Sequence, residues 1–600
     1  MNRTLGPRQF VALSLIVALF CVTPAVPAQW PGDGDEFSQH LSHLASDEMR
    51  GRGNDRPEID LAADYIAYWF ERYGLAPGGD NDTYFHEFEA RTSVEVGPTT
   101  SLVISLDGET HHMKHQSDYV ALFSGPVPAL APLAFAGFGI TAPELGYDDY
   151  AGLDVQGKVV AVFQHEPEEQ LESSRFSGTD SSPWFTLTYK AFNAKRHGAV
   201  GLLVLPDPGC GRERAWDQDV QVEALGIPTV KLNEEWAAKL LRAGPFRRQE
   251  INRAARNLSL VPFDIPDVTI SLRVEAIERY RTLRNVVGVV HGTTDRYVVI
   301  GAHYDHLGLG QRKALSPENI GQVHNGADDN ASGTAGLLHL ASLFSGEKPE
   351  IGLVFIAFAA EELGLLGSSA FVARPTIPLD TIRAMINMDM IGRSDGTLFV
   401  GGVGTAVEFR DLLNRLKEKT LLNLSYAETP QAPSDHLSFS GERIPVLFFF
   451  TGLHADYHQP SDDVEKIDRV RTGEVLRLVE SLLRYLVRED QPVTFVETDT
   501  NTALLGAAAG STLLGLVVDP SWEADGILVA DVKPATPAFH AGFQRGDILF
   551  GCDGKAITNR HDLITELTQP EVPSGTLHNI NVLRGEELLR LMLSTAAETE

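Results

Sequence analysis

The chain has 600 residues, of which 43% are hydrophobic and 22% charged, a composition typical of folded globular proteins. This length exceeds what a single hydrophobic core usually supports, so we expect three or four domains. The formal net charge of −31 argues against nucleic acids and anionic membranes as partners, because both attract clustered Lys and Arg side chains.

The first 28 residues have the pattern of a secretory signal peptide. Arg3 and Arg8 precede an apolar run from Phe10 to Val22, and small residues lead to a cleavage point after Ala28. This run is shorter than the roughly 20 apolar residues of a membrane span, and no later stretch is long enough to be one. We therefore expect export to the periplasm or the medium, with no membrane span after the signal is removed.

Two cysteines would remain in the exported chain, Cys210 and Cys552. They lie far apart in the sequence, and we expect both to be free thiols. The exported fold would then not depend on disulfide bonds.

Residues 29–131 begin with a helical pattern. Apolar residues recur at i, i+3 and i+4 from Asp35 to Glu89, and Gly74 is placed to end the second helix. Shorter β-like runs follow at 101–106 and 119–123.

Residues 132–263 contain strand-like runs separated by turns. The segment 146–158, with the sequence GYDDYAGLDVQGK, lies just before one of these runs. This segment resembles the protease-associated domain that is inserted in some exopeptidases. The alternative is an unrelated β-rich insertion.

Residues 284–488 alternate between strands and helices, which predicts an α/β domain with a mixed, mostly parallel sheet between two layers of helices. Strands are predicted at 296–303, 351–360, 382–390 and 445–451, and helices at 331–345, 363–372, 406–419 and 469–488. The run 351–360 is apolar almost throughout, as expected for a strand that is buried on both faces.

The C-terminal part begins with a linker rich in small residues, at 491–512. Residues 513–600 contain short strands, the turn Arg545-Gly546-Asp547 and a helix near 562–568. This pattern resembles a PDZ domain of the bacterial type, in which residues 513–516 would present backbone N–H groups to the C-terminus of a peptide.

Two adjacent carboxylates, Glu361 and Glu362, follow the apolar strand at the end where open α/β sheets place their ligand sites. Such neighbours repel each other and are costly to desolvate without a cation. One of them can bind a metal ion while the other moves a proton. The alternative is a solvated helix N-terminus, where the helix dipole favours acidic residues.

Four further polar clusters lie at strand ends or loops of the same region, and each alone has an ordinary structural explanation. They contribute His303 and Asp305 in HYDH, either Asp328 or Asp329 in GADDNASG, Asp389 in NMDMIG, and Tyr457 and His458 in YHQPSDD. Together with the glutamate pair they supply the ligands for two zinc ions bridged by one carboxylate, with one glutamate to spare.

The order of these clusters resembles the dizinc exopeptidases that include secreted bacterial aminopeptidases. Relatives in that superfamily include glutamate carboxypeptidase, glutaminyl cyclase and the non-catalytic transferrin receptor ectodomain. The resemblance covers about residues 284–488. It implies a zinc peptidase core at 264–490, whose N-terminal part at 29–131 is separated from it by the insertion at 132–263.

The resemblance also implies the metal ligands. His303 and Asp389 would hold one zinc ion, and Glu362 and His458 the other. Asp329 would bridge them, in preference to Asp328, because the bridging acid of the family directly precedes a run like that at 330–333. A cis peptide bond after the bridging residue is implied as well.

Further residues receive roles from the same resemblance. Glu361 would be the general base, and the Tyr457 hydroxyl would stabilise the oxyanion. The arrangement His303-Tyr304-Asp305 by itself lets His303 bind a metal while Asp305 orients a neighbouring group. Asp435, in the run SDHLSF, matches a pocket segment and would line the substrate site.

The expected function is that of an exported aminopeptidase with two zinc ions, acting on peptides with a free N-terminus. A carboxypeptidase of the same superfamily would need a cationic pocket that the sequence does not locate. Glutaminyl cyclase chemistry uses one zinc ion, whereas this chain retains the full set of ligands. A catalytically inactive, receptor-like scaffold would be expected to have lost ligands. Cobalt or manganese could occupy similar sites.

Overall fold

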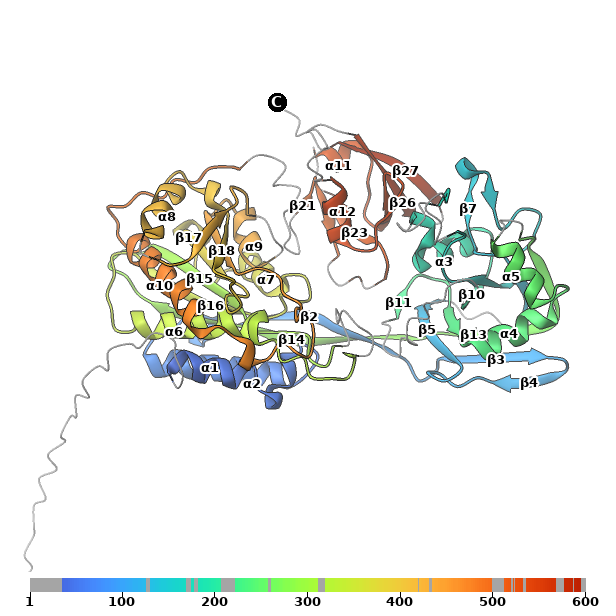
Figure 1. Cartoon of the computed structure of the whole chain (residues 1–600), viewed down its shortest axis with the longest axis horizontal. Coiled ribbons are helices and arrows are strands. Elements are labelled where there is room, and N and C mark those ends of the chain that lie inside the picture. Colours follow the sequence, from blue (N-terminus) through green and yellow to red (C-terminus); the bar gives the residue numbers. More distant parts are fainter. Residues whose placement is uncertain are drawn as a thin grey trace, which may run out of the picture.

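The structure is a computed structural model of the chain. It describes residues 35–125, 130–168, 174–176, 182–206, 222–256, 260–310, 319–418, 420–430, 434–498, 512–519, 522, 524–532, 536–567, 577–585 and 587–594. The expected signal peptide, Cys210 and most of the expected linker lie outside these residues. Three bodies are visible: an α/β domain, a β-rich domain inserted into it, and a small C-terminal domain (Figure 1).

The α/β domain is built on a nine-stranded sheet in the order β1-β14-β16-β15-β17-β20-β18-β19, with β2 also paired to β14. Strands β16, β15, β17 and β20 run parallel to one another at its centre. The strands are β1 (Ala76–Pro77), β2 (Phe85–Val96), β14 (Ala276–Val290), β15 (Tyr297–His303), β16 (Gly352–Phe358), β17 (Ile382–Met388), β18 (Thr397–Gly401), β19 (Asn423–Tyr426) and β20 (Val446–Phe450). The helices are α1 (Glu36–Leu44), α2 (Glu58–Tyr73), α6 (Gly333–Phe344), α7 (Leu366–Ala373), α8 (Phe409–Lys417), α9 (His436–Gly441) and α10 (Arg469–Leu486).

Alternate side chains of the central strands belong to two different hydrophobic cores. Val298 and Ile300 of β15 lie in the larger core with α1, α2, α6, α8 and α10, whereas Val299 lies in a second core with Phe371 of α7 and Phe439 of α9. Helices therefore cover both faces of the sheet, which confirms the predicted fold class. Each strand and helix predicted between 284 and 488 is present, with ends that shift by a few residues.

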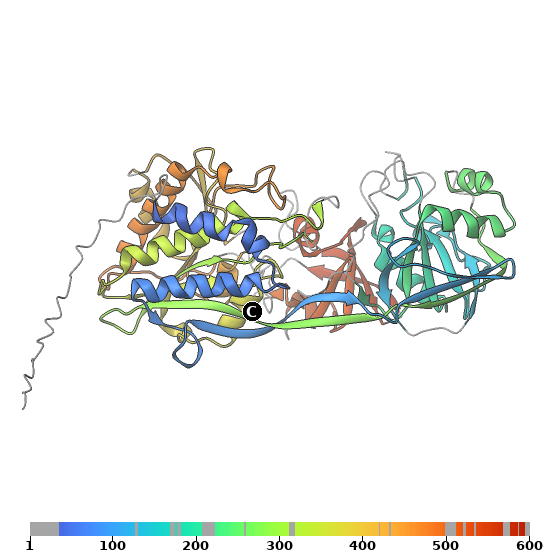
Figure 2. The ribbon, with the colours of Figure 1, turned by 90° about the horizontal axis from the view of Figure 1, so that it is seen from below.

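The N-terminal region departs from its predicted pattern. Helices α1 and α2 are present, and Gly74 ends α2 in a left-handed conformation with φ +80°. The helical pattern predicted as far as Glu89 is wrong, because β2 begins at Phe85 and pairs with β14. Figures 1 and 2 show these two long strands as an arm that leads to the inserted domain. In the outer part of the arm, Tyr280 of β14 is exposed, and the buried residues of β2 include the polar Thr92, so no run of alternating apolar residues marks these strands in the sequence.

The inserted domain is larger than the predicted range 132–263. Its nine-stranded sheet has the order β11-β5-β12-β10-β9-β6-β13-β3-β4, so β3, β4 and β5 belong to it and not to the α/β domain. The strands are β3 (Ser101–Leu106), β4 (Glu109–His112), β5 (Tyr119–Ser124), β6 (Ala131–Phe135), β9 (Val159–Phe163), β10 (Gly201–Leu205), β11 (Glu223–Ala224), β12 (Thr229–Leu232) and β13 (Phe263–Arg273). Its helices are α3 (Leu187–Arg196), α4 (Glu234–Ala243) and α5 (Arg248–Arg256). A short β7 (Thr141–Ala142) and β8 (Tyr147–Asp148) pair separately within the insertion. Its protease-associated character stays a prediction.

The C-terminal domain packs against the inserted domain. Phe550 of β24 stacks on Tyr189 of α3 with ring centroids 5.4 Å apart, and Ile548 and Leu583 join the hydrophobic core of the insertion. The elements are β21 (Thr512–Leu513), β22 (Leu516–Val518), β23 (Ile527–Val532), α11 (Pro537–His540), β24 (Asp547–Cys552), β25 (Lys555–Ala556), α12 (Arg560–Leu567), β26 (Leu577–Arg584) and β27 (Glu587–Ser594). Cys552 is buried and forms no disulfide, as predicted.

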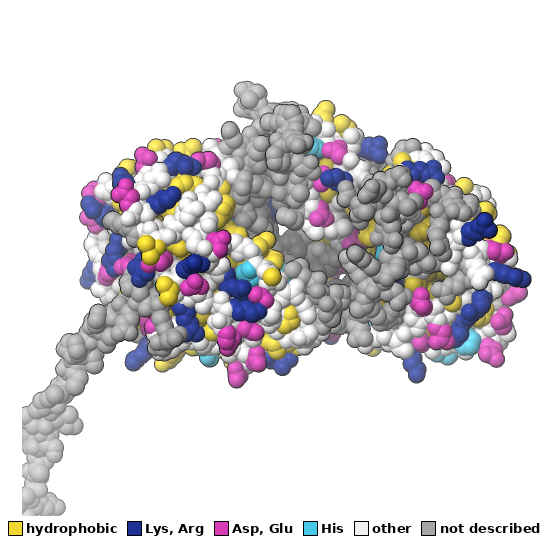
Figure 3. Space-filling view, viewed as in Figure 1, with side chains coloured by type: hydrophobic (Ala, Val, Ile, Leu, Met, Phe, Trp, Pro, Cys, Tyr) yellow, Lys and Arg dark blue, Asp and Glu magenta, His cyan; other side chains and the backbone are white. Residues whose placement is uncertain are grey.

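Acidic and basic side chains are interspersed on the face shown in Figure 3. None of the helices in the described part of the chain has the length and apolar character needed to span a membrane.

Candidate metal centre

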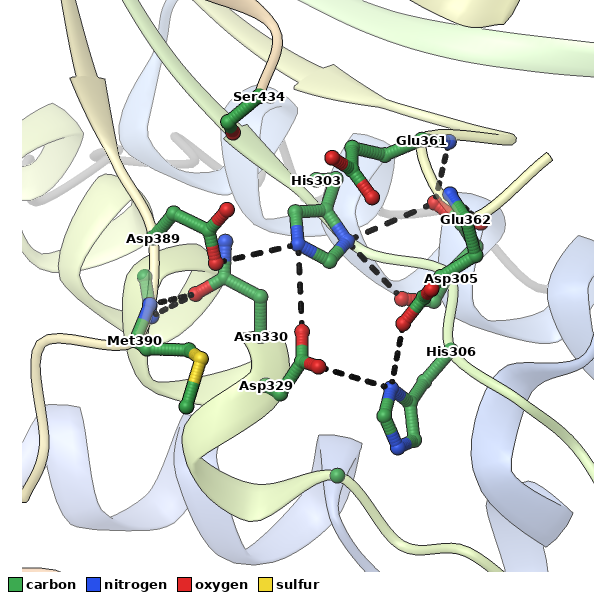
Figure 4. Close-up of polar contacts among 12 residues, drawn as sticks. His303, Asp305, His306, Asp329, Asn330, Glu361, Glu362, Asp389, Met390 and Ser434 are labelled. Carbon is green, nitrogen blue, oxygen red and sulfur yellow. Dashed lines mark hydrogen bonds and ion pairs between the residues drawn. The ribbon is translucent and has the colours of Figure 1, made fainter. Parts of the chain in front are cut away.

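The carboxyl ends of the parallel strands bring the predicted metal ligands together. His303 ends β15, Asp389 directly follows β17, and Glu362 lies just beyond β16. Asp329 lies in the irregular turn Ala327–Ser332 that leads into α6, and His458 follows β20. Parallel strands end at one edge of a sheet, so residues from distant parts of the sequence meet there (Figure 4).

The donor atoms form two groups that share Asp329. In the first group, His303 Nε2 lies 3.4 Å from Asp329 Oδ1 and 3.3 Å from Asp389 Oδ1. In the second group, His458 Nε2 lies 3.3 Å from Asp329 Oδ2 and 3.4 Å from Glu362 Oε1. Zinc–ligand bonds of 2.0–2.1 Å in tetrahedral geometry place neighbouring donors about 3.3–3.4 Å apart. The residues therefore fit two zinc ions bridged by Asp329.

Asp329, and not Asp328, faces the centre. The carboxylate of Asp328 instead accepts hydrogen bonds from Gly392 N at 2.6 Å and Ser332 Oγ at 3.0 Å, and its other oxygen lies 3.2 Å from His454 Nε2. The peptide bond between Asp329 and Asn330 is cis, as the resemblance implies.

Two side chains hold the Asp329 turn in place, and the sequence reasoning assigned neither of them a role. Asp462 Oδ2 accepts the backbone N–H groups of Asp328 and Asp329 at 3.0 and 3.1 Å. Asn330 donates through Nδ2 to Met388 O, and its Oδ1 accepts the N–H of Met390. Asn330 thus connects the turn to the end of β17, where Asp389 lies.

Glu361 is buried beside the two groups, but among the described residues its carboxylate belongs to neither group of donors. Burial raises the pKa of its carboxyl well above the usual range, although the nearby His303 opposes that shift. A carboxyl group with a raised pKa can accept a proton and release it again, which suits a general base.

Asp305 positions both glutamates through their backbone. Its Oδ1 accepts the N–H of Glu361 at 3.1 Å, and its Oδ2 accepts the N–H of Glu362 at 3.2 Å. Its own backbone carbonyl lies 3.1 Å from His303 Nδ1, on the ring side opposite the donor pair. Asp305 therefore orients three residues of the centre without facing a metal position itself, and such outer contacts tune metal affinity.

We expect the Asp305→Asn variant to bind zinc about 10–100-fold more weakly than the wild type. The amide nitrogen of Asn would place a donor against one of the two backbone N–H donors, so one glutamate would lose its support. Chelator competition measures the affinity. Asp80→Asn, which changes an acid of a surface ion pair with Arg374, is the control; equal affinity in both variants would contradict the expectation.

The N-terminal segment supplies a buried cation beneath the centre. Arg52 donates to the carbonyl oxygens of Tyr304, Asn325, Gly326 and Leu44 at 2.5–3.0 Å. Burial lowers the pKa of Arg52 to about 10, while the surrounding acids, with Asp329 first, oppose that shift. Next to it, Asn54 Nδ2 donates to Asp305 Oδ2 at 2.6 Å. In the sequence, this arginine is marked only by the glycines on either side of it, Gly51 and Gly53.

Gly51 shows why glycine flanks this arginine. Its φ is +68°, and a Cβ atom there would collide with the carbonyl oxygens of His324 and Gly308. The backbone around Arg52 thus lies directly against the loop after β15.

Arg52→Met should unfold at a lower temperature than the wild type, with a loss of more than about 3 kcal/mol in the free energy of unfolding. Methionine keeps an unbranched apolar stem but removes the donor of four buried carbonyl oxygens, of which that of Gly326 also accepts the N–H of Ala331. Calorimetry of the metal-free variant measures this loss. Arg52→Lys, which keeps the charge and some donors, should lose less; equal losses would show that the carbonyl contacts do not matter.

Tyr457 and Asp435 have different surroundings. The ring of Tyr457 stacks on His458 with centroids 3.8 Å apart, and burial raises the pKa of its hydroxyl, so this group remains a donor at neutral pH. Asp435 is fully buried, and burial raises its pKa to about 7. It influences Glu361 and His303 electrostatically but has no exposed surface, so the structure does not place it on the wall of an open pocket.

The two histidines hold protons in the metal-free centre. Burial alone would lower the pKa of His458, but Glu362 and Asp329 outweigh it and raise the value to about 10. Burial also favours a lower pKa for His303, but the charges of Asp389 and Glu361 outweigh it and raise this pKa well above its usual value. Zinc binding must therefore displace protons.

The affinity for zinc should consequently rise with pH between about pH 6 and 9, by about tenfold per pH unit for each proton displaced. The sign follows from the raised pKa values of both histidines, because their protonated forms compete with the metal, and that of His458 persists up to about pH 10. Chelator competition at several pH values measures the slope. A flat profile over this range would show that both ligands are already deprotonated.

A third group of donors lies in the C-terminal domain, where Cys552, Asp553 and His578 converge. Burial raises the pKa of the Cys552 thiol, which keeps it protonated, and His578 Nδ1 is already 2.7 Å from Asp553 Oδ2. This group is therefore poorly prepared to bind a metal.

The fold and the site together define an α/β domain with a candidate metal centre at the carboxyl edge of its central strands. Residues 285–483 match peptidase family M28, and residues 497–595 match the PDZ domain. These two regions are thus similar to an M28 peptidase domain and to a PDZ domain.

Curated relatives match the same region. Leucine aminopeptidase 1 of Ajellomyces capsulatus (strain H88) is 33% identical over 215 residues, which are 33% of this chain and 54% of that protein. Aminopeptidase YwaD of Bacillus subtilis (strain 168) is 28% identical over 224 residues, which are 35% of this chain and 46% of that protein. The chain thus spans about half the length of these relatives.

Among solved structures, an aminopeptidase from Aneurinibacillus sp. strain AM-1 is 22% identical with a TM-score of 0.47, covering 77% of this chain and 96% of that one. The zinc aminopeptidase BSAP from Bacillus subtilis is 20% identical with a TM-score of 0.47, covering 76% of this chain and 97% of that one.

Proposed function

We propose that this chain is an exported aminopeptidase that uses two zinc ions to remove N-terminal residues from peptides. The observation that carries the proposal is the pair of donor groups joined by Asp329, with the buried Glu361 beside them. The match to peptidase family M28 and the aminopeptidase names of the relatives support the reaction class. Export rests on the signal-like pattern of residues 1–28.

His303 and Asp389 would hold one zinc ion, Glu362 and His458 the other, and Asp329 both. Bound zinc in such a centre polarises the scissile carbonyl and lowers the pKa of a water molecule.

The chain's own residues move the proton and stabilise charge. The Glu361 carboxylate would take the proton of the attacking water and deliver it to the leaving amine. Asp305 holds the backbone of Glu361, so the carboxylate starts from a defined position. The Tyr457 hydroxyl, kept protonated by its raised pKa, would donate a hydrogen bond to the developing oxyanion.

The PDZ domain gives a second, separate binding function. We infer that residues 513–516 receive the C-terminus of a peptide or partner, which is a general property of PDZ domains.

A panel of peptides with free and acetylated N-termini tests the proposal. Cleavage of the free peptides alone, abolished by chelation and restored by zinc, is the expected result. Cleavage of acetylated peptides from the C-terminus would indicate the carboxypeptidase instead. Stoichiometric zinc without any cleavage would favour a receptor-like scaffold.

A further inference from the structure

His306 follows three residues after His303 and faces the same two carboxylates as His458. Its Nδ1 lies 3.0 Å from Glu362 Oε1 and 3.7 Å from Asp329 Oδ2 (Figure 4). These are the two oxygen atoms that His458 Nε2 approaches at 3.4 and 3.3 Å. Two imidazole rings therefore converge on one pair of carboxylate oxygens.

The position of the His306 ring is fixed by its surroundings. The side chain is fully buried, and a Cβ atom on Gly326 would collide with its ring atoms. Its other nitrogen, Nε2, is buried and has no hydrogen-bond partner among the described residues. Nδ1 is thus the nitrogen that the fold directs at polar groups.

The spacing of these atoms is that of metal ligands. The separations of 3.0 and 3.7 Å lie on either side of the 3.3–3.4 Å or so expected between donors on one zinc ion. Nδ1 of His306, Asp329 and Glu362 form a compact donor group without the help of His458. A cation between them would neutralise two buried carboxylates that otherwise repel each other.

We propose that His306 binds the metal ion on the Glu362 side through Nδ1, in addition to His458. This inference rests on the metal centre of the proposed function. It makes the two metal positions unequal, because the Glu362 side would have four protein ligands and the His303 side three. Closed sites with four protein ligands are typical of structural zinc, whereas catalytic zinc keeps an open position. The His303 side would then be the one open to substrate.

X-ray absorption of the purified, zinc-loaded protein tests the ligand count directly. We expect three imidazoles shared between the two zinc ions, and two in the His306→Ala variant. In chelator competition this variant should lose more than about 100-fold in affinity at one of its two sites, beyond the 10–100-fold or so of an outer-contact change. The wild-type spectrum needs no variant, so the test stands even if His306→Ala does not fold.

His454→Ala is the matched control, since His454 also faces a carboxylate of this region but that of Asp328, outside both donor groups. Its zinc affinity and imidazole count should equal those of the wild type. Two imidazoles in the wild type, or an unchanged affinity in His306→Ala, would overturn the assignment of His306 while leaving the proposed enzyme intact. A wild type that binds no zinc would overturn the proposed function as well.

Discussion

Glu361→Gln should retain both zinc ions and lose turnover by about 10²–10⁴-fold, the range of general acid–base catalysis. The amide has the shape of the carboxylate and keeps the backbone contact to Asp305, but it cannot accept a proton. Zinc content by atomic absorption and kcat on a peptide with a free N-terminus measure the two effects separately.

The neighbouring glutamate provides the control for this prediction. Glu362→Gln changes a carboxylate of the same strand end, but one that faces His306 and His458 at 3.0 and 3.4 Å. It should lose zinc together with activity. If Glu361→Gln kept near-wild-type turnover, Glu361 would not be the base. If it lost zinc, Glu361 would be a ligand.

Asp329→Ala should remove zinc from both positions and abolish activity. The Asp329 carboxylate places one oxygen 3.4 Å from His303 Nε2 and the other 3.3 Å from His458 Nε2, so one substitution deletes a donor from each group. We expect the affinity of both positions to fall by more than about 100-fold, beyond the effect of an outer-contact change. Zinc titration by calorimetry measures it.

Asp328→Asn separates this effect from damage to the turn. Asp328 holds Gly392 and Ser332 and contacts neither metal-ligand histidine, so its loss should lower the unfolding temperature of the metal-free protein more than it lowers zinc affinity. A variant Asp329→Ala that still bound one zinc ion tightly would show that the carboxylate does not bridge the two positions.

The local pattern of the α/β domain was readable from the sequence. The strands β15, β16, β17 and β20 are short apolar runs that are buried on both faces. Short runs of this kind between helical segments are typical of the central strands of a parallel sheet. Polar residues that directly follow such strands must lie at one edge of the sheet. His303, Glu362 and Asp389 were therefore predictable as a group, although the same residues in other contexts are ordinary caps and surface side chains.

The arm and the domain boundary were not readable in this way. In the middle of the arm, Ala90, Thr92 and Val94 of β2 are buried, but one of them is polar, and the paired Tyr280 of β14 is exposed. The sequence therefore shows no clear apolar alternation there, and pairing between segments some 190 residues apart in sequence makes them strands. The sequence also did not show that β3, β4 and β5 belong to the inserted domain. This depends on pairing between distant segments, because β5 joins the inserted sheet by pairing with β12.

By itself, the sequence determined the fold class, the approximate positions of the central strands and the types of side chain available to a metal, because these depend on local periodicity and on chemistry at single positions. Tertiary structure alone decided that His306 points at Glu362 and that Arg52 lies beneath the centre. Arg52 meets Asn325 and Gly326 across more than 270 positions of sequence. No local pattern encodes such a contact, because its geometry depends on how the N-terminal segment packs against the completed sheet.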